Sequence, residues 1–157
     1  METRNWIGKD FRRYDEGGLM EISVWDGEGN EYGNYDHTQL DFTPLLKSHW
    51  DINKDQFGFE YSAWVVPFTM KEGAFTMSDI FESESEIWAP MPSPVSGAVG
   101  FVHSHPGRKI SSTAMSEKDE TAEKVLRLPF FVIACDDGLL IRCLDRNGNV
   151  KIELTTT

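Results

Sequence analysis

Cysteine is scarce in this sequence, whose 157 residues include only Cys135 and Cys143. Each falls in its own predicted strand of one hairpin, either on opposite faces or several residues apart along one face. Neither arrangement brings two Cα atoms within the roughly 7 Å that a disulfide needs. The sequence therefore predicts two small buried side chains in a reducing compartment, and not a fold held together by disulfides.

Basic side chains and long apolar runs are also in short supply. The chain has 15 Lys and Arg against 26 Asp and Glu, which gives a formal charge of −11. A surface of this kind lacks the basic footprint that binds phosphates and repels anionic lipids, so neither nucleic acid nor a membrane is expected as a partner. No apolar run approaches the roughly 20 residues of a membrane span, and the first residues lack the layout of a signal peptide. We therefore expect a cytoplasmic protein.

Apolar and aromatic residues are plentiful enough for a packed core. They make up 39% and 12% of the chain, more than a disordered protein contains. The length fits one domain over residues 1–157, of which 1–39 would be an N-terminal strand extension.

Strand and turn signals alternate along the chain and are interrupted by two helical segments. Strands are expected at 19–25, 59–70, 74–81, 98–102, 130–135, 139–145 and 149–154, where apolar and β-branched runs end at turn residues. One helix is expected at 45–50 after Thr43-Pro44, and another from the cap Ser116 to Leu128. This order predicts an α+β domain with a mixed β-sheet packed against helices.

The dipeptide Asn147-Gly148 predicts the register of the last hairpin. A two-residue turn there pairs Asp145 with Val150, Leu144 with Lys151, Cys143 with Ile152, Arg142 with Glu153 and Ile141 with Leu154. One face is then apolar, and the other carries an opposite-charge pair.

His103 and His105 are separated by one residue at the tip of the strand expected at 98–102, and Pro106 follows at once. Residues i and i+2 of a strand project from the same face, so both imidazoles can point at one position. Asp119 lies in the first turn of the following helix, where a carboxylate can turn toward the same point. Two imidazoles and a carboxylate leave one open position on a tetrahedral Zn²⁺, as a catalytic site requires.

The pattern Ser116-Glu117-Lys118-Asp119 has a second interpretation as an ordinary helix cap. Asp119 alone would more often be a cap than a ligand, and a lone His-x-His is weak evidence. The combination of an apolar strand, His-x-His-Pro, a loop of small residues and a capped helix is what favours a metal site.

These residues resemble the signature of the JAMM metalloproteases, also called the JAB/MPN fold, which reads His-x-His-Pro, a loop, then Ser-x-x-Asp. The matching residues are His103, His105, Pro106, Ser116 and Asp119, and the resemblance covers about residues 40–154. It implies a JAB/MPN-like (cytidine-deaminase-like) domain of the compact bacterial type, with zinc held by His103, His105 and Asp119. It also implies that Ser116 stabilises the tetrahedral intermediate.

The loop between His105 and Asp119 is longer than the usual family spacing, and the extra residues fall within 107–115. The alignment of Ser116 with Asp119 is kept. Glu117 and Glu120 would become ligands only if the helix began in a different register.

An upstream glutamate in this family takes the proton of the zinc-bound water, and the sequence offers five candidates: Glu60, Glu72, Glu82, Glu84 and Glu86. Glu72 falls in an expected turn, and the last three belong to an acidic run typical of an exposed loop. Glu60 begins an apolar strand after a helical region, as the family's glutamate does. We therefore predict Glu60 as the general base, with a charged residue at a strand edge as the alternative.

The resemblance implies a zinc-dependent peptidase or isopeptidase that cleaves an amide bond next to the C-terminal tail of a ubiquitin-like or other protein. Two alternatives remain open at this point. One is an MPN-type scaffold that binds partners without catalysis, and the other is a metal-dependent amidase acting on a cell-wall peptide.

Three other features have weaker assignments. Residues 83–96 are either a flap over substrate or an ordinary long loop. The five tryptophans are interpreted as core and groove lining, with Trp64 as the one to test for substrate contact. His37 and His49 lack the spacing of a second metal site and are interpreted as structural or surface residues.

Overall fold

The computed structural model describes residues 20–55, 60–82 and 93–157. Its elements in chain order are β1 (Glu21–Trp25), β2 (Glu31–Asp36), the short 3-10 helix η1 (His37–Gln39), α2 (Thr43–Asp55), β3 (Tyr61–Pro67), β4 (Phe75–Glu82), β5 (Gly100–Ser104), the 3-10 helix η2 (Ile110–Ser112), α3 (Glu117–Leu126), β6 (Phe130–Cys135), β7 (Gly138–Leu144) and β8 (Val150–Thr156). Six strands form one sheet in the order β4-β3-β5-β6-β7-β8, and β1 pairs with β2 in a separate small sheet.

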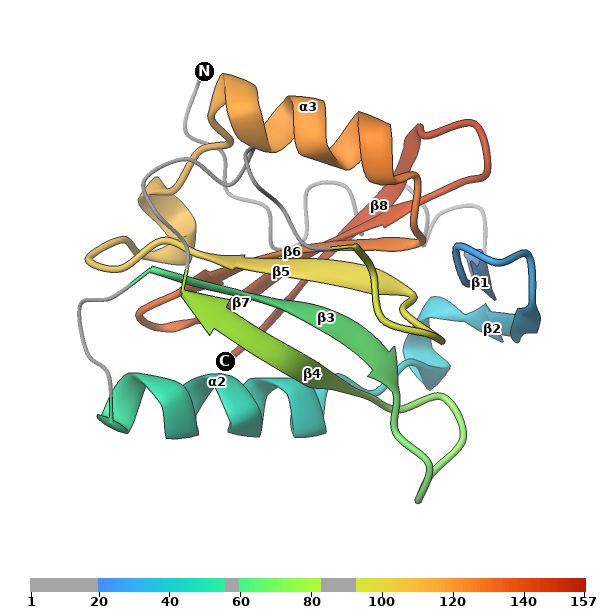
Figure 1. The fold of residues 1–157 in the computed structure, drawn as a ribbon, viewed down its shortest axis with the longest axis horizontal. Helices are drawn as coiled ribbons and strands as arrows, with labels where there is room; N and C mark the ends of the chain where they lie inside the picture. The colour runs from blue at the N-terminus through green and yellow to red at the C-terminus, as the bar shows by residue number, and fades with distance from the viewer. Residues whose placement is uncertain (1–19, 56–59, 83–92) are drawn as a thin grey trace.

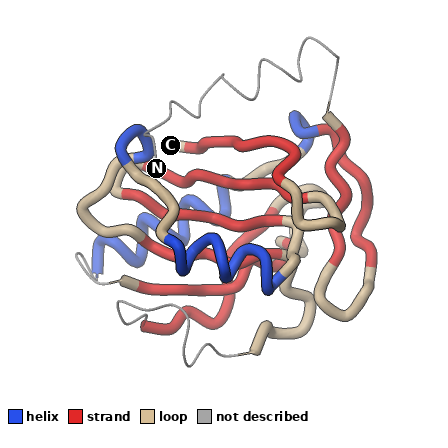
Figure 2. The backbone as a smooth tube through the Cα atoms, turned by 90° about the horizontal axis from the view of Figure 1, so that it is seen from above, coloured by secondary structure: helices blue, strands red, loops and turns tan. Residues whose placement is uncertain are grey.

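The six-stranded sheet lies between the two helices, with α3 on one face and α2 on the other (Figure 1). Seen from above, α3 lies in front of the sheet and runs roughly along its strands, while α2 lies behind them (Figure 2). Of the neighbouring strands described in this sheet, only β5 and β6 pair in parallel, and the chain between them passes through η2 and α3. A parallel pair needs such a crossover, and here the crossover contains Asp119. The prediction of an α+β domain with a mixed sheet packed on helices is confirmed.

Each face of the six-stranded sheet packs against an apolar core, so the central strands are buried on both sides. In β6, Phe130, Val132 and Ala134 belong to the cluster with Leu45 of α2. The alternate residues of the same strand pack with Ala122 of α3. A strand buried on two faces is continuously apolar, as β6 is over its whole length.

An ion-paired cluster attaches α3 to the sheet. The guanidinium Nε of Arg142 on β7 lies 2.6 Å from Glu123 Oε2 of α3, and its Nη1 lies 3.1 Å from Glu153 Oε2 of β8. Both carboxylates are almost fully buried. The predicted pairing of Arg142 with Glu153 is confirmed, and the third member from α3 fixes the helix that carries Asp119.

The predicted register of the last hairpin is correct for the pairs farther from the turn and wrong for the pairs next to it. Cys143, Arg142 and Ile141 pair as predicted, but Leu144 pairs with Val150 instead of Lys151. Asp145 explains the shift, because its carboxylate accepts hydrogen bonds from the backbone N–H groups of Asn147 and Asn149 and widens the turn.

Several expected bounds also change. The first helix extends from Thr43 to Asp55, beyond the expected 45–50, and β3 ends at Pro67 rather than at 70. Strand β2 was missed because its sequence is mostly polar and carries no apolar alternation. Cys135 and Cys143 are buried and free, as predicted. Within the described residues, neither helix has the length and apolar character that crossing a membrane requires.

Trp64 belongs to the core, as one interpretation of the tryptophans had it, and it is not placed to contact a substrate. Its side chain is 1% exposed and packs beside Phe101 in the core under α3, with ring centroids 5.1 Å apart. The strand alternation explains why, since Trp64 faces the same covered side of the sheet as Phe101. Most of the proposed flap at 83–96 lies outside the described residues.

His49 is a buried structural residue of α2. Its Nε2 lies 2.7 Å from the carbonyl oxygen of Cys135, and its Nδ1 lies 2.6 Å from the Tyr61 hydroxyl. Because a carbonyl only accepts, Nε2 carries the proton and Tyr61 donates to Nδ1. Burial lowers the pKa of His49, although the Cys135 carbonyl and Asp136 oppose that change.

Acid is therefore expected to destabilise the fold through His49. In the unfolded chain this imidazole binds a proton below pH about 6.5, whereas in the folded chain it does so only at a lower pH. The contribution of His49 to the free energy of unfolding is therefore fully present above pH about 6.5 and decreases below it. One such group contributes at most about 1.36 kcal/mol per pH unit. Urea unfolding between about pH 7.5 and 5 in the presence of a chelator should give a shallower pH dependence for His49→Gln than for the wild type. Equal slopes would contradict this, and NMR titration of the wild-type imidazole replaces the variant if it does not fold.

Candidate metal centre

Strand β5 delivers both histidines to the face of the sheet that α3 covers. His103 pairs with Ser62 of β3 and with Ile133 of β6, and it is 4% exposed. The backbone N–H of His105 donates to Ala134 O, so the chain stays in register with β6 for one more residue. The two imidazole centroids lie 5.3 Å apart with nearly perpendicular rings. The expectation that both histidines project from one face of a strand tip is met.

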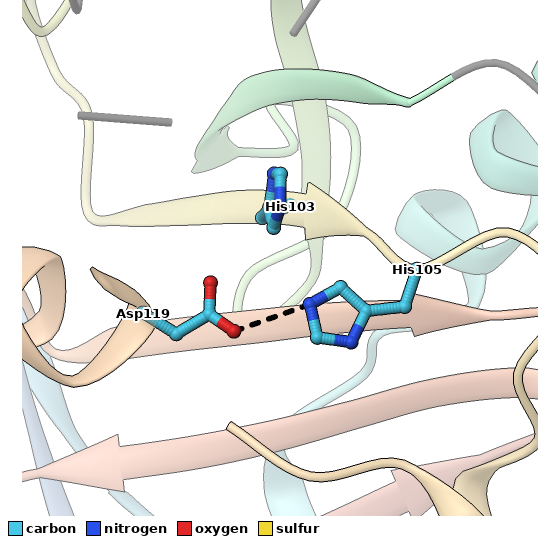
Figure 3. Close-up of side chains that lie close together, drawn as sticks. All are labelled: His103, His105 and Asp119. Carbon is cyan, nitrogen blue, oxygen red and sulfur yellow. Dashed lines mark ion pairs between the residues drawn. The ribbon is translucent and has the colours of Figure 1, made fainter. Parts of the chain in front are cut away.

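Asp119 reaches the same place from the first turn of α3. Its Oδ2 lies 3.2 Å from His105 Nε2 (Figure 3). The same oxygen accepts a hydrogen bond from the backbone N–H of Ser116 at 3.0 Å. The Ser116 hydroxyl in turn accepts from the Asp119 N–H. The two interpretations of this motif are thus both realised, because one carboxylate closes the capping box and faces the histidines.

These three side chains could hold a metal ion. Each offers one ligand atom, and the three atoms lie within 4.8 Å of one another. Two imidazoles and a carboxylate match the donors of catalytic zinc sites, which keep one position open. Among the residues that the structure describes, no other group of three such side chains comes together in this way.

The protonation states of His103 and Asp119 are those that metal binding requires. Burial lowers the pKa of His103 to about 4, so this imidazole is neutral at physiological pH. Burial works to raise the pKa of Asp119, but hydrogen bonds from His105 and the Ser116 N–H outweigh it and lower that pKa. A neutral imidazole and an ionised carboxylate are the forms that bind metal.

Two hydroxyl groups that the sequence analysis missed orient the histidines. Ser62 Oγ lies 3.2 Å from His103 Nδ1, and Thr113 Oγ1 lies 2.9 Å from His105 Nδ1. Each Nδ1 therefore has a partner, which leaves Nε2 as the atom for a metal. Strand pairing could have indicated Ser62, since it lies directly opposite His103. Thr113 comes from an irregular loop, and no pattern in the sequence signals it.

Thr113→Val is expected to weaken metal binding. The valine keeps the shape of this buried side chain but removes the partner of His105 Nδ1, so the imidazole is no longer held in orientation. Loss of the hydrogen bond that orients a metal-binding histidine lowers the metal affinity by about 10–100-fold. Competition with a chromogenic chelator measures it. Thr121→Val is the matched control, because this exposed hydroxyl binds only Glu117 O within its own helix, and an equal loss there would remove the assignment.

The histidines border a pocket of about 460 Å³ that also contains the predicted catalytic residues. Its lining residues are Glu60, His103, His105, Pro106, Arg108, Thr113, Ala114, Met115 and Ser116. Glu60 precedes β3 directly and is partly buried. Burial raises the pKa of Glu60, and the Asp119 charge acts in the same direction while His105 opposes it. The sequence motif and the upstream glutamate therefore meet at one pocket.

The other candidate glutamates are less well placed. Glu72 lines a different pocket, beside Tyr35 and Phe75. Glu82 is exposed at the end of β4, and Glu84 and Glu86 lie outside the described residues. Ser116 is exposed to the pocket, and its hydroxyl proton is available because Oγ acts as the acceptor in the cap.

Comparison with known proteins assigns no family to the chain. No protein-family model matches it, and no curated protein matches it significantly. The resemblance to the JAMM signature therefore depends on the residues of the site alone.

Proposed function

We propose that this protein is a JAMM-type zinc metallopeptidase that hydrolyses an amide or isopeptide bond next to the C-terminal tail of a ubiquitin-like or other protein. The observation that supports it most is that His103 and His105, which form a group with Asp119, line the same pocket as Glu60. The sheet with β5 ending at the histidines and α3 following them is consistent with a JAB/MPN-like domain. The free buried cysteines favour a cytoplasmic location.

In this proposal His103 Nε2, His105 Nε2 and one Asp119 oxygen would hold the ion. Zinc chemistry at such a site consists of activating water and polarising a carbonyl. The Glu60 carboxylate accepts a proton from water in the pocket and returns it to the departing amine. The Ser116 hydroxyl donates a hydrogen bond to the oxygen on which negative charge develops.

The two competing functions make different predictions. An MPN-type scaffold has no need for a complete ligand set, and this chain keeps all three ligands with hydroxyl partners on both histidines. An amidase acting on a cell-wall peptide would use the same centre, and only its substrate differs.

Metal analysis and a cleavage assay separate these functions. Purified protein should contain close to one equivalent of zinc, which a chelator removes. Incubation with fusions of ubiquitin-like proteins, with and without chelator, should give zinc-dependent cleavage at the tail. A preparation that neither contains nor takes up zinc would refute both enzymes, whereas cleavage confined to cell-wall peptides would favour the amidase.

A further inference from the structure

The described lining of the pocket includes one positively charged side chain, although the chain has a formal charge of −11. Among the described residues around the pocket, Arg108 is the only Lys or Arg, and it follows His105 by three positions. Its side chain is exposed and forms no hydrogen bond or ion pair with the described residues. An unpaired guanidinium beside a candidate catalytic centre is a natural partner for an anionic group of the substrate.

The backbone of Arg108 is fixed by the turn between β6 and β7. Its carbonyl accepts from the N–H of Asp136 at 2.8 Å, and its own N–H donates to His105 O at 3.2 Å. On either side, the N–H groups of Gly107 and Ile110 donate to the carboxylates of Asp136 and Asp137 at 3.0 and 2.9 Å. These bonds hold the loop at a set place relative to His105, so the guanidinium extends from a rigid base.

We propose that Arg108 binds the free α-carboxylate of a short leaving group, so that the enzyme releases C-terminal amino acids or dipeptides. This inference rests on the proposed function. A C-terminal carboxylate always lies on the amine side of the bond to be cleaved. Because one pocket of about 460 Å³ contains both the candidate centre and Arg108, only a short leaving group places its carboxylate there. A lysine joined through an isopeptide bond within a folded protein offers no such carboxylate.

The reaction consumes one water. The amide C–N bond breaks and a C–O bond forms, so the acyl part leaves as a carboxylate. The freed amine retains its own α-carboxylate at Arg108 and takes up both protons of that water, the first of them delivered by Glu60, so it leaves as an ammonium group. No oxidant, reductant or further reactant is needed.

Three labelled peptides test the assignment. All have the same sequence up to Gly-Gly, which is followed by alanine with a free carboxylate, by alanine amide, or by Nα-acetyl-lysine amide joined through its Nζ, which offers no carboxylate and should be cleaved no better than the alanine amide. The zinc-loaded wild type should cleave the free carboxylate with a kcat/KM about tenfold above the amide, the gain typical of one charge-assisted pair. In Arg108→Gln the ratio of these two kcat/KM values should fall to about one.

Lys109→Gln is the matched control. Lys109 is the next residue of the same loop, is also exposed, and does not line the pocket. Its substitution changes the net charge equally, so it should leave the carboxylate preference at the wild-type value. Equal loss in both variants would attribute the preference to overall charge and overturn the inference.

Binding separates this inference from the proposed function. Full-length Glu60→Gln loaded with zinc should bind the free carboxylate about tenfold more tightly than the amide by NMR titration, and Glu60→Gln with Arg108→Gln should not. Equal affinities in Glu60→Gln, or binding of neither peptide, refute the carboxylate site even if the wild type is an active peptidase. Selective binding without any cleavage by the wild type refutes the peptidase and keeps the site.

Discussion

Glu60→Gln should lower turnover by about 10²–10⁴-fold while the fold and the metal affinity stay unchanged. Glutamine has the shape of glutamate but cannot accept a proton from water at neutral pH. Glu60 borders the pocket without belonging to the three-residue ligand group, so its charge is not needed to hold the ion. The measurements are kcat on a cleaved substrate, the zinc content and the urea midpoint of each protein.

Glu72→Gln is the control for this variant. It removes the same charge from a residue that also precedes an apolar strand, but Glu72 lines a separate pocket beside Tyr35. Its turnover should match the wild type. Full activity of Glu60→Gln, or an equal loss in Glu72→Gln, would remove Glu60 from the mechanism, and loss of zinc from Glu60→Gln would make it a ligand instead.

Local sequence patterns could predict the candidate metal centre because its three residues lie within one short stretch of the chain, at the end of β5 and in the first turn of α3. Strand alternation places His103 and His105 on one face, and the capping pattern places Asp119 in the first helical turn. The crossover between the parallel strands β5 and β6 then returns α3 over that face. Few long-range contacts have to be known for these three side chains to meet.

Features that depend on distant packing could not be predicted in the same way. Thr113 meets His105 only because the loop folds back between η2 and α3, and a loop of small residues carries no periodic signal. Arg108 was not identified because its position depends on Asp136 and Asp137, which follow it by almost thirty residues. The choice between core and substrate contact for Trp64 stayed open because a strand sequence does not reveal which of its faces a helix will cover.

Glu60 had to be chosen among five glutamates for the same reason. The strand after Glu60 was predicted with longer bounds than β3 has, and proximity to the histidines follows from the antiparallel pairing of β3 with β5, which puts Ser62 opposite His103. Register between non-consecutive strands cannot be read from one sequence, because the buried run of β3 suits several partners.

Asp119→Asn should reduce zinc affinity by more than about 100-fold, beyond the loss expected for a residue that only orients a ligand. Asparagine keeps an oxygen that can accept from the Ser116 N–H, so the capping box persists while the ionised ligand is lost. Zinc at 100 times its Kd stabilises the wild type by about 2.7 kcal/mol, and a hundredfold weaker site leaves about 0.4 kcal/mol. Urea unfolding with and without zinc measures the difference.

Glu117→Gln and Glu120→Gln distinguish a ligand from a helix cap. Both residues are exposed in the first turn of α3, so each variant loses the same charge near the helix N-terminus and about the same 0.3–1 kcal/mol of helix stability. Neither should change the zinc-dependent gain. If Asp119→Asn kept the zinc-dependent gain in stability and matched these controls, Asp119 would only cap the helix and would not be a metal ligand. If Glu117→Gln or Glu120→Gln lost the gain instead, α3 would present its ligand in another register, and the longer loop after His105 would be the cause.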